Sequence, residues 1–206
     1  MESIKPTRSE LIRLKKNIKL AKGGHRLLKK KRDGLIMEFF ELMKKAKMVR
    51  YELQKRYKAT QECMKLARIE RSSQEIESLA LAVSKHPELI MKTKNIMGVS
   101  VPRIEGFGIH RNLNEKGFGY VDLPAALLEA ADAYEELVDY VVLAAEVETS
   151  MKKILLEIDH TKRRVNALEY RLIPQMQSVQ SFIQLRLEEI ERETVFRTKL
   201  IKKRLA

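Results

Sequence analysis

The chain has 206 residues, of which 44% are hydrophobic, with one cysteine and no tryptophan. This hydrophobic content can build a packed core and argues against a disordered protein, and a single cysteine excludes an internal disulfide framework. The formal net charge is +13, and residues 1–60 carry all of that excess, with 19 Lys or Arg against 6 Asp or Glu. No stretch is long and apolar enough to cross a bilayer and the N-terminus has no apolar signal core, so we expect a soluble, cytoplasmic protein.

The first predicted element is a long helix that runs from about Leu11 to Arg71. Its apolar or small residues recur in steps of three and four, which is the heptad pattern of a helix that packs along a partner helix. About sixty residues at 1.5 Å per residue would extend roughly 90 Å. The residues of this seam are Leu11, Leu14, Ile18, Ala21, His25, Leu28, Arg32, Leu35, Phe39, Leu42, Ala46, Val49 and Leu53.

Two adjacent glycines, Gly23 and Gly24, interrupt this helix beside the polar seam position His25. Glycine weakens a helix but permits close approach of a partner backbone. We therefore expect a second helix to cross closely here, near residues 175–185, so that a large side chain at Gly24 would wedge the two helices apart.

The middle of the chain is predicted to be irregular. Residues 72–89 are typical of a short capped helix that breaks before Pro87, because the residue preceding proline disfavours the helical conformation. The following segment holds five of the eight glycines, and residues 99–104 and 117–121 alternate as short strands do, which predicts a small β-hairpin. The side chains that this hairpin would present for packing or docking are Phe107, Ile109, Phe118 and Tyr120.

A second long helix is predicted to begin after Asp122 as N-cap, with Pro124 in its first turn, and to run nearly to the C-terminus. Pro174 should bend this helix locally without ending it, because heptad spacing resumes on both sides. The seam of this helix is predicted to include Leu137, Val141, Ala144, Met151, Leu155, Ile158, Val165, Leu168, Leu172, Met176, Val179, Ile183 and Ile190.

Together these elements predict an all-α fold: a long antiparallel two-helix coiled coil with a short helical and β-hairpin middle segment. The expected parts are an N-terminal coiled-coil helix over 1–71, the middle over 72–121 and a C-terminal coiled-coil helix over 122–206. Antiparallel pairing would bring the two ends of the chain together in one strongly positive tip. The basic residues of this expected tip are Arg8, Arg13, Lys15, Lys16, Lys19, Lys199, Lys202, Lys203 and Arg204.

The sequence contains no recognisable catalytic, cofactor or metal site. Gly23-Gly24-His25 is not followed by the Lys-Ser or Lys-Thr of a phosphate-binding loop, and the glycine-rich middle lacks the strand, turn and helix of a dinucleotide fold. The four histidines are far apart, which disfavours a shared metal site. The basic helix could neutralise nucleic-acid phosphates, but residues 7–38 contain no aromatic side chain on which the bases of a single strand could stack, so we expect no nucleic-acid partner. Binding of a duplex by charge alone stays physically open.

Three segments resemble the D subunit of archaeal and bacterial V/A-type rotary ATPases. They are PTRSELIRLKKNIKLAKGGHRLLKKKRD over 6–33, RRVNALEYRLIP over 163–174 and LEEIERETVFRTKLIKKR over 187–204, joined by the VSVP segment at 99–102. The resemblance extends over nearly the whole chain, and the glycine-rich middle is its least comparable part.

This resemblance implies a non-catalytic central stalk, whose paired termini enter a hexamer of alternating A and B subunits. It further implies binding to the F subunit and to the funnel subunit over the membrane c-type ring, with no cofactor and with membrane association only through the complex, at the cytoplasmic face. The basic tip would face the stator. An alternative from the residues alone is a basic coiled-coil adaptor for nucleic acid or an anionic membrane surface.

Overall fold

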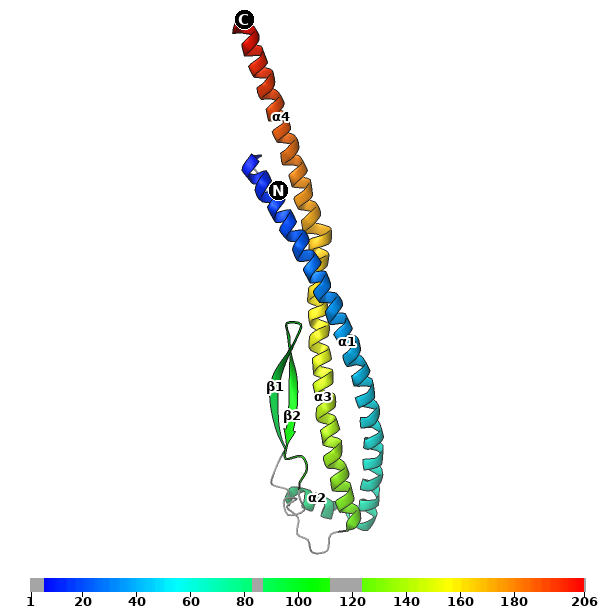
Figure 1. The fold of residues 1–206 in the computed structure, drawn as a ribbon. Coiled ribbons are helices and arrows are strands. Elements are labelled where there is room, and N and C mark those ends of the chain that lie inside the picture. The colour runs from blue at the N-terminus through cyan, green and yellow to red at the C-terminus, as the bar shows by residue number, and fades with distance from the viewer. Residues whose placement is uncertain (1–5, 83–86, 112–123, 206) are drawn as a thin grey trace. The chain divides into compact units, whose positions relative to one another are not determined.

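The computed structural model describes residues 6–82, 87–111 and 124–205. The predicted fold class is confirmed, because long N- and C-terminal helices flank a short helix and one antiparallel two-stranded hairpin (Figure 1). Asp122, Phe118, Tyr120 and the rest of the expected strand 117–121 lie outside the described residues. The elements are α1 (Arg8–Glu70), α2 (Ser73–Ala82), β1 (Glu88–Ile96), β2 (Val99–Phe107), α3 (Ala125–Asn166), the π-helical turn η2 (Ala167–Leu172) and α4 (Ile173–Leu205).

The chain divides into two compact units, which are described separately. Unit 1 comprises Met1–Gly34 with Ile158–Ala206, and unit 2 comprises Leu35–Glu157. The expected parts 1–71, 72–121 and 122–206 divide the chain along the sequence, whereas these units group residues by spatial contact. The three-part division therefore stays a prediction.

The start of α1 follows from Thr7, which acts as its N-cap. The Thr7 hydroxyl accepts a hydrogen bond from the Glu10 amide at 3.3 Å, and the Thr7 carbonyl accepts one from the Leu11 amide at 3.1 Å. These bonds satisfy amides that have no partner within the helix, and the carboxylate of Glu10 suits the positive end of the helix dipole. All thirteen predicted seam residues of α1 are buried or half-buried, so the seam prediction for this helix is confirmed.

In unit 1, α1 pairs with the C-terminal helical segment in antiparallel orientation. Arg8 contacts Glu191 and His25 contacts Glu169, while Ile18, Val165 and Ile183 are buried. The helix continues through Pro174, as predicted. The π-helical turn η2 comes just before it, and the Ile173 amide donates to the carbonyl of Leu168. Because proline has no amide and crowds the preceding turn, a wider turn lets the helix pass it.

The predicted seam of the second long helix is partly wrong. Val141, Leu155, Leu172 and Ile190 are exposed, whereas the other predicted seam residues are buried or half-buried. Ile154 is fully buried and its neighbour Leu155 is 50% exposed. Both are apolar and adjacent, and one residue turns a helix by about 100°. Only the position of the packing partner decides which of the two faces inward.

In unit 2, polar contacts fix the register between α1 and α3. Arg50 forms an ion pair with Glu148 at 2.6 Å, and Arg56 pairs with Glu136. The Thr60 hydroxyl, 2% exposed, donates to the Arg56 carbonyl at 2.9 Å and lies 3.4 Å from the Ala133 carbonyl of α3. Sliding the helices would separate the two ion pairs and move the Thr60 hydroxyl away from the Ala133 carbonyl, so these contacts favour the observed register.

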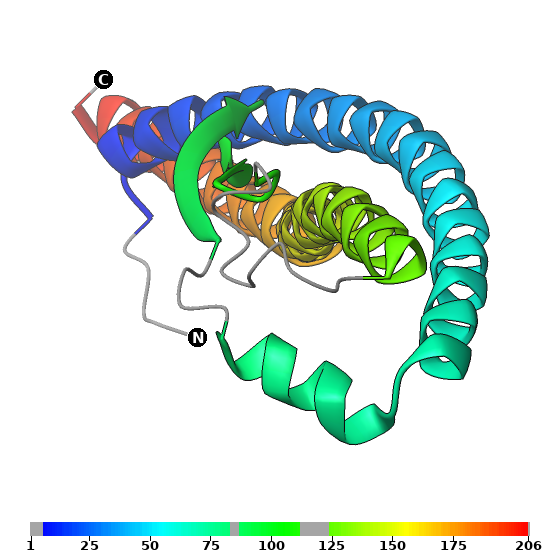
Figure 2. The same cartoon turned by 90° about the horizontal axis from the view of Figure 1, so that it is seen from below.

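The short helix α2 closes one end of unit 2. Ser72 caps it, because its hydroxyl accepts from the Glu75 amide at 3.4 Å, which confirms the predicted capped start. Figure 2 shows α2 turning away from the end of α1 instead of continuing its axis. This turn places apolar residues of α2 against the ends of α1 and α3. The resulting cluster contains Ala67, Leu127 and Ala130, with Cys63, Met64, Ile76 and Leu79 packed against it.

The β-hairpin exists, but its strand pairing differs from the prediction. The partner of β2 is β1, with Ile96 opposite Val99 across a two-residue turn of Met97 and Gly98. Both turn residues have positive φ, 49° and 85°, as in the mirror-image turns that suit the strand twist of hairpins. The Asn95 side chain stabilises the turn by accepting from the Gly98 amide at 2.8 Å. The sequence Met-Gly is a weak turn signal, which is why β1 was not predicted.

Candidate functional site: the uncovered end of the C-terminal helix

The expected basic tip is divided into two clusters in unit 1. The Arg8 guanidinium, at the first residue of α1, lies 2.5 Å from the Glu191 carboxylate, and α4 continues to Leu205. Residues 199–204 therefore extend about 12–20 Å along α4 beyond the start of α1, at 1.5 Å per residue. All nine basic residues are exposed, but the prediction that both ends of the chain form one tip is wrong for the described residues. The reason is a longer C-terminal helix.

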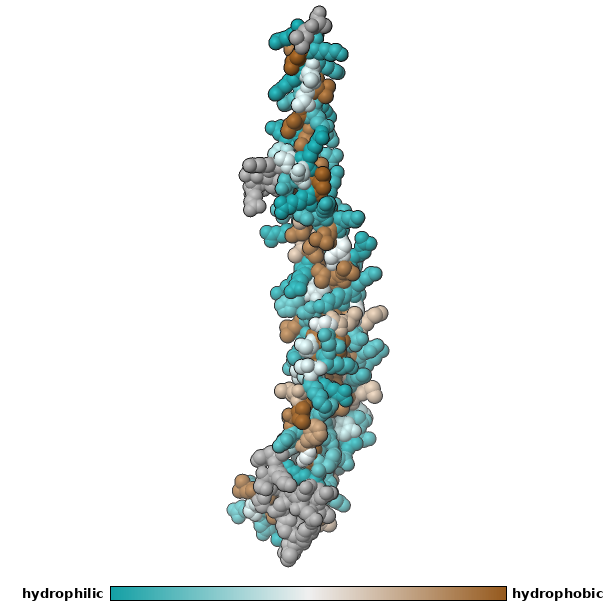
Figure 3. Space-filling view, turned by 60° about the vertical axis from the view of Figure 1, so that its left-hand side comes forward, coloured by the Kyte–Doolittle hydropathy of each residue, from teal (hydrophilic) through white to brown (hydrophobic). Residues whose placement is uncertain are grey.

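The uncovered end of α4, which we define as residues 192–204, combines basic and apolar side chains. Val195 is 52% exposed, Phe196 is 66% exposed and Ile201 is 56% exposed. Figure 1 shows α4 continuing beyond the start of α1, with no other described helix beside its C-terminal end. On the face drawn in Figure 3, apolar side chains occur among hydrophilic ones toward this end. Exposed large apolar side chains on a helix without a partner are typical of a surface that another protein covers.

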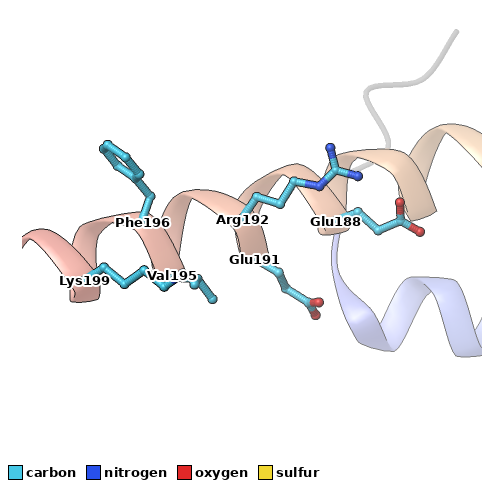
Figure 4. Close-up of a pocket in the computed structure, with 6 residues that line it drawn as sticks. All are labelled: Glu188, Glu191, Arg192, Val195, Phe196 and Lys199. Carbon is cyan, nitrogen blue, oxygen red and sulfur yellow. The ribbon is translucent and has the colours of Figure 1, made fainter.

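An open depression of about 460 Å³ lies along the same part of α4. It is lined by Glu188, Glu191, Arg192, Val195, Phe196 and Lys199. Figure 4 shows that these side chains leave the helix in different directions, with Arg192 and Phe196 on one side and Glu191 on the other. Side chains that diverge from one helix cannot enclose a small molecule, so this surface is suited to a protein partner.

The predicted close crossing at the glycines is wrong. A Cβ added at Gly23 or Gly24 would meet no atom within 4 Å, so neither glycine makes room for a partner backbone. The neighbouring His25 lies 3.3 Å from Glu169 in η2, whereas the predicted crossing was at residues 175–185. The main reason is that α4 extends beyond the start of α1, so that Arg8 lies opposite Glu191 and the partner of every later α1 residue is displaced toward the N-terminal side of the second helix.

The expected docking residues of the hairpin region have different environments. Phe107 is 50% exposed, as a docking residue requires. Ile109 is 7% exposed, because its side chain folds over Gly106, where an added Cβ would collide with it. Ile109 is therefore an internal packing residue.

Four polar side chains of α3 that the sequence analysis did not single out hold the hairpin and the segment after it. The Glu146 carboxylate accepts from the Ile104 amide at 3.0 Å, and the Ser150 hydroxyl lies 3.4 Å from the Pro102 carbonyl. Asp139 lies 2.5 Å from the His110 ring, and Glu135 accepts from the Arg111 amide at 3.2 Å. Their spacing of four, seven and four residues is a helical-face pattern, and this polar stripe was the available signal.

Histidines and carboxylates of the described residues make contacts between elements. Where the chain is described, no group of three or more His, Cys, Asp or Glu side chains could hold a metal ion. His25 and His110 each contact a carboxylate from another element. A hydrogen bond from Lys92, helped by the charges of Lys92 and Arg103, holds the pKa of Glu105 below its ordinary value. Among the described helices, none has the length and apolar character that a membrane span requires.

Comparison with known proteins assigns the chain to a family. The family model that describes the D subunit of ATP synthase matches residues 10–203. The chain is 50% identical to the A-type ATP synthase D subunit of Methanococcoides burtonii over 202 residues, which cover 98% of both chains. It is 47% identical to the protein of the same name from Methanosarcina acetivorans, over 99% of this chain and 98% of the relative. The Haloarcula marismortui relative is 47% identical over 98% of this chain and 87% of its own length. Because the match includes both long helices and the hairpin between them, the chain belongs to the family of ATP synthase D subunits.

Proposed function

We propose that the chain is the non-catalytic central rotor shaft of a V/A-type rotary ATPase or ATP synthase. In this role it couples ion translocation through the membrane ring to ATP synthesis or hydrolysis in the A/B hexamer by rotating. The observation that carries the proposal is the uncovered end of α4, in a chain whose family belongs to ATP synthase complexes. A helix end with exposed apolar and basic residues needs an enclosing protein partner.

The helices suit the transmission of torque. α1 runs for 63 residues without interruption, and α3, η2 and α4 form one continuous helix from Ala125 to Leu205. An α-helix joined to another along a heptad seam resists bending and unwinding, because either motion breaks packing along the whole seam. Register contacts such as Arg50 with Glu148 oppose sliding of one helix past the other.

The proposed partners follow from this role. The uncovered end of α4 enters the central cavity of the hexamer of A and B subunits, while other parts of the chain bind the F subunit and the funnel subunit over the c-type ring. The chain then stays at the cytoplasmic face of the membrane and associates with it only through the complex.

We propose further that the basic clusters face acidic or polar loops of the hexamer. Exposed ion pairs are individually worth only about 0.2–1 kcal/mol, so a rotor can exchange them at each rotational step at little cost. Neutralising Lys199, Lys202, Lys203 and Arg204 together should therefore weaken assembly at low salt and make it less sensitive to salt, because the attraction that salt screens is gone. Equal affinity and equal salt dependence of wild-type and neutralised chains would contradict the electrostatic part of the proposal.

Direct observation of rotation tests the main proposal. The complex is reconstituted with the full chain, the hexamer is fixed to a surface, and a bead is attached to an introduced cysteine in a Cys63→Ser background. The expected result is ATP-dependent rotation of the bead in one direction, and none with a non-hydrolysable nucleotide. A bead that stays fixed while the complex hydrolyses ATP would show that the chain is not a rotor.

A second candidate is a basic adaptor, which the charge of +13 favours. Binding to nucleic acid or an anionic membrane would fall steeply with salt because it rests on counterion release. Assembly through the apolar end of α4 should persist as salt rises. Binding measured against duplex DNA, anionic vesicles and the hexamer over one salt series separates the two functions.

A further inference from the structure

The two edges of the β-hairpin have different surroundings in unit 2. β2 faces α3, and the polar side chains of Glu146 and Ser150 bond to its backbone. In Figure 1, β1 lies on the side of the hairpin away from α3. Every residue of β1 from Glu88 to Asn95 is exposed.

The register shows which backbone groups point outward. Across a two-residue turn the closing pair, here Ile96 and Val99, exchanges both hydrogen bonds, and bonded and non-bonded pairs then alternate. Thr93 opposite Pro102 and Met91 opposite Ile104 are therefore non-bonded pairs. Two independent observations agree with this assignment. Proline has no amide hydrogen, so Pro102 could not donate to β1 in a hydrogen-bonded pair. The Ile104 amide and the Pro102 carbonyl instead contact Glu146 and Ser150 of α3.

By the same alternation, every second residue of β1 directs its amide and carbonyl away from β2. These residues are Leu89, Met91, Thr93 and Asn95. Within the described chain, no other element bonds to these backbone groups. Proteins protect such edges with lysines, proline, bulges or short strands. β1 carries Lys92 and Lys94, but it is nine residues long and contains neither proline nor a break in register.

The side chains of β1 add a chemical preference. Leu89, Ile90 and Met91 are 57%, 46% and 74% exposed, so both faces of the strand present apolar surface. Lys92 is paired with Glu105 at 2.6 Å, whereas Lys94 has no ion-pair partner among the described residues. A strand beside β1 would gain from apolar residues near the first three positions and from a carboxylate near Lys94.

We propose that the outer edge of β1 accepts an extended segment of another protein of the complex, which adds a third strand to the hairpin. This rests on the proposed assembly into a rotary complex. Backbone hydrogen bonds supply affinity, and the apolar and acidic side chains of the added strand supply specificity. A second copy of this chain is disfavoured in the antiparallel register centred on Thr93, because Lys92 of each copy would lie opposite Lys94 of the other.

Hydrogen exchange at single-residue resolution tests this edge. In the free chain, the outward amides of Leu89, Met91, Thr93 and Asn95 should exchange fast, and the inward amides of β1 should be protected. In the reconstituted complex, the outward amides should slow by about tenfold or more, as expected when an amide becomes hydrogen-bonded in a structure that opens less often. Concentration-dependent protection in the free chain would assign the edge to a second copy and overturn the proposal.

A matched pair of variants identifies the backbone as the recognised feature. Met91→Pro removes one outward amide without touching a bond to β2, whereas Met91→Ala removes the side chain and keeps the amide. Protection of Leu89 and Thr93 in the complex should be lost in the proline variant and retained in the alanine variant. Equal protection in both would contradict strand addition.

The variant Lys94→Glu keeps every backbone amide and carbonyl of β1. It replaces Met91→Pro as the test if the proline variant no longer forms the hairpin. It should reduce the protection of Thr93 and Asn95 in the complex, and unchanged protection would contradict the acidic partner. Fast exchange of all outward amides in a complex that still rotates would overturn the strand addition and leave the rotor function standing. A complex in which the outward amides are protected but which fails to rotate would overturn the rotor function and leave the strand addition standing.

Discussion

Units 1 and 2 both contain an antiparallel helix pair, but they differ in what covers that pair. In unit 2 the pair carries its own additional partners, because α2 and the hairpin cover parts of α1 and α3 and polar contacts fix the register. In unit 1, α4 continues past the start of α1 with Val195, Phe196 and Ile201 exposed. The comparison indicates that one region is stabilised within the chain and that the other depends on a partner from outside.

The largest effect is expected from a buried residue of unit 2. Ile154→Ala should reduce the free energy of unfolding by about 2–5 kcal/mol, because a fully buried aliphatic side chain leaves a cavity when truncated. Leu155→Ala, at the neighbouring 50% exposed position, should change it by less than about 0.5 kcal/mol. Urea unfolding followed by circular dichroism measures both. Equal losses would show that the two residues share the seam.

Phe196 in the uncovered end of α4 should behave in the opposite way. Phe196→Ala should leave the free energy of unfolding of the isolated chain within about 0.5 kcal/mol of wild type, because the ring is 66% exposed. It should weaken assembly with the hexamer by more than about 1 kcal/mol if the ring is buried there. Titration of the hexamer with labelled chain measures this, with Ile183→Ala as the control that loses stability in the free chain. Unchanged assembly would remove the argument for an enclosing partner.

Gly24→Ala should stabilise the chain. An added Cβ meets nothing within 4 Å, and alanine is favoured over glycine inside a helix by about 0.5–1 kcal/mol. The free energy of unfolding and the melting temperature should both rise, and Gly23→Ala should act in the same direction. A loss of stability would instead support the predicted close packing of a second helix against these glycines.

The smallest effect concerns pH and the hairpin. The bond from Lys92 lowers the pKa of Glu105 in the folded chain, so ionised Glu105 stabilises the hairpin above the ordinary glutamate pKa. This contribution should fade as pH falls through the lowered folded pKa, and Glu105→Gln should remove that pH dependence. The chemical shift of the Glu105 carboxyl, titrated by NMR, reports it. Because Lys92 is exposed, the change in overall stability should be slight.

The helices of this protein follow from its sequence alone. Capping residues such as Thr7 and Ser72 begin helices through contacts within a few residues, and the heptad spacing of α1 made every seam prediction there correct. The family also followed from local motifs, since its residues keep their order and spacing along the chain.

Helix rotation, register and strand pairing come instead from tertiary contacts. Ile154 and Leu155 are equally apolar, and only the partner helix selects the buried one. The length of α4 beyond the start of α1 displaced the contact of His25 to Glu169 and separated the basic clusters that a simple hairpin would have joined. β1 became a strand through its pairing with β2, although its own residues signal a turn only weakly. Each of these features depends on contacts between residues far apart in the chain, and a local pattern does not contain their geometry.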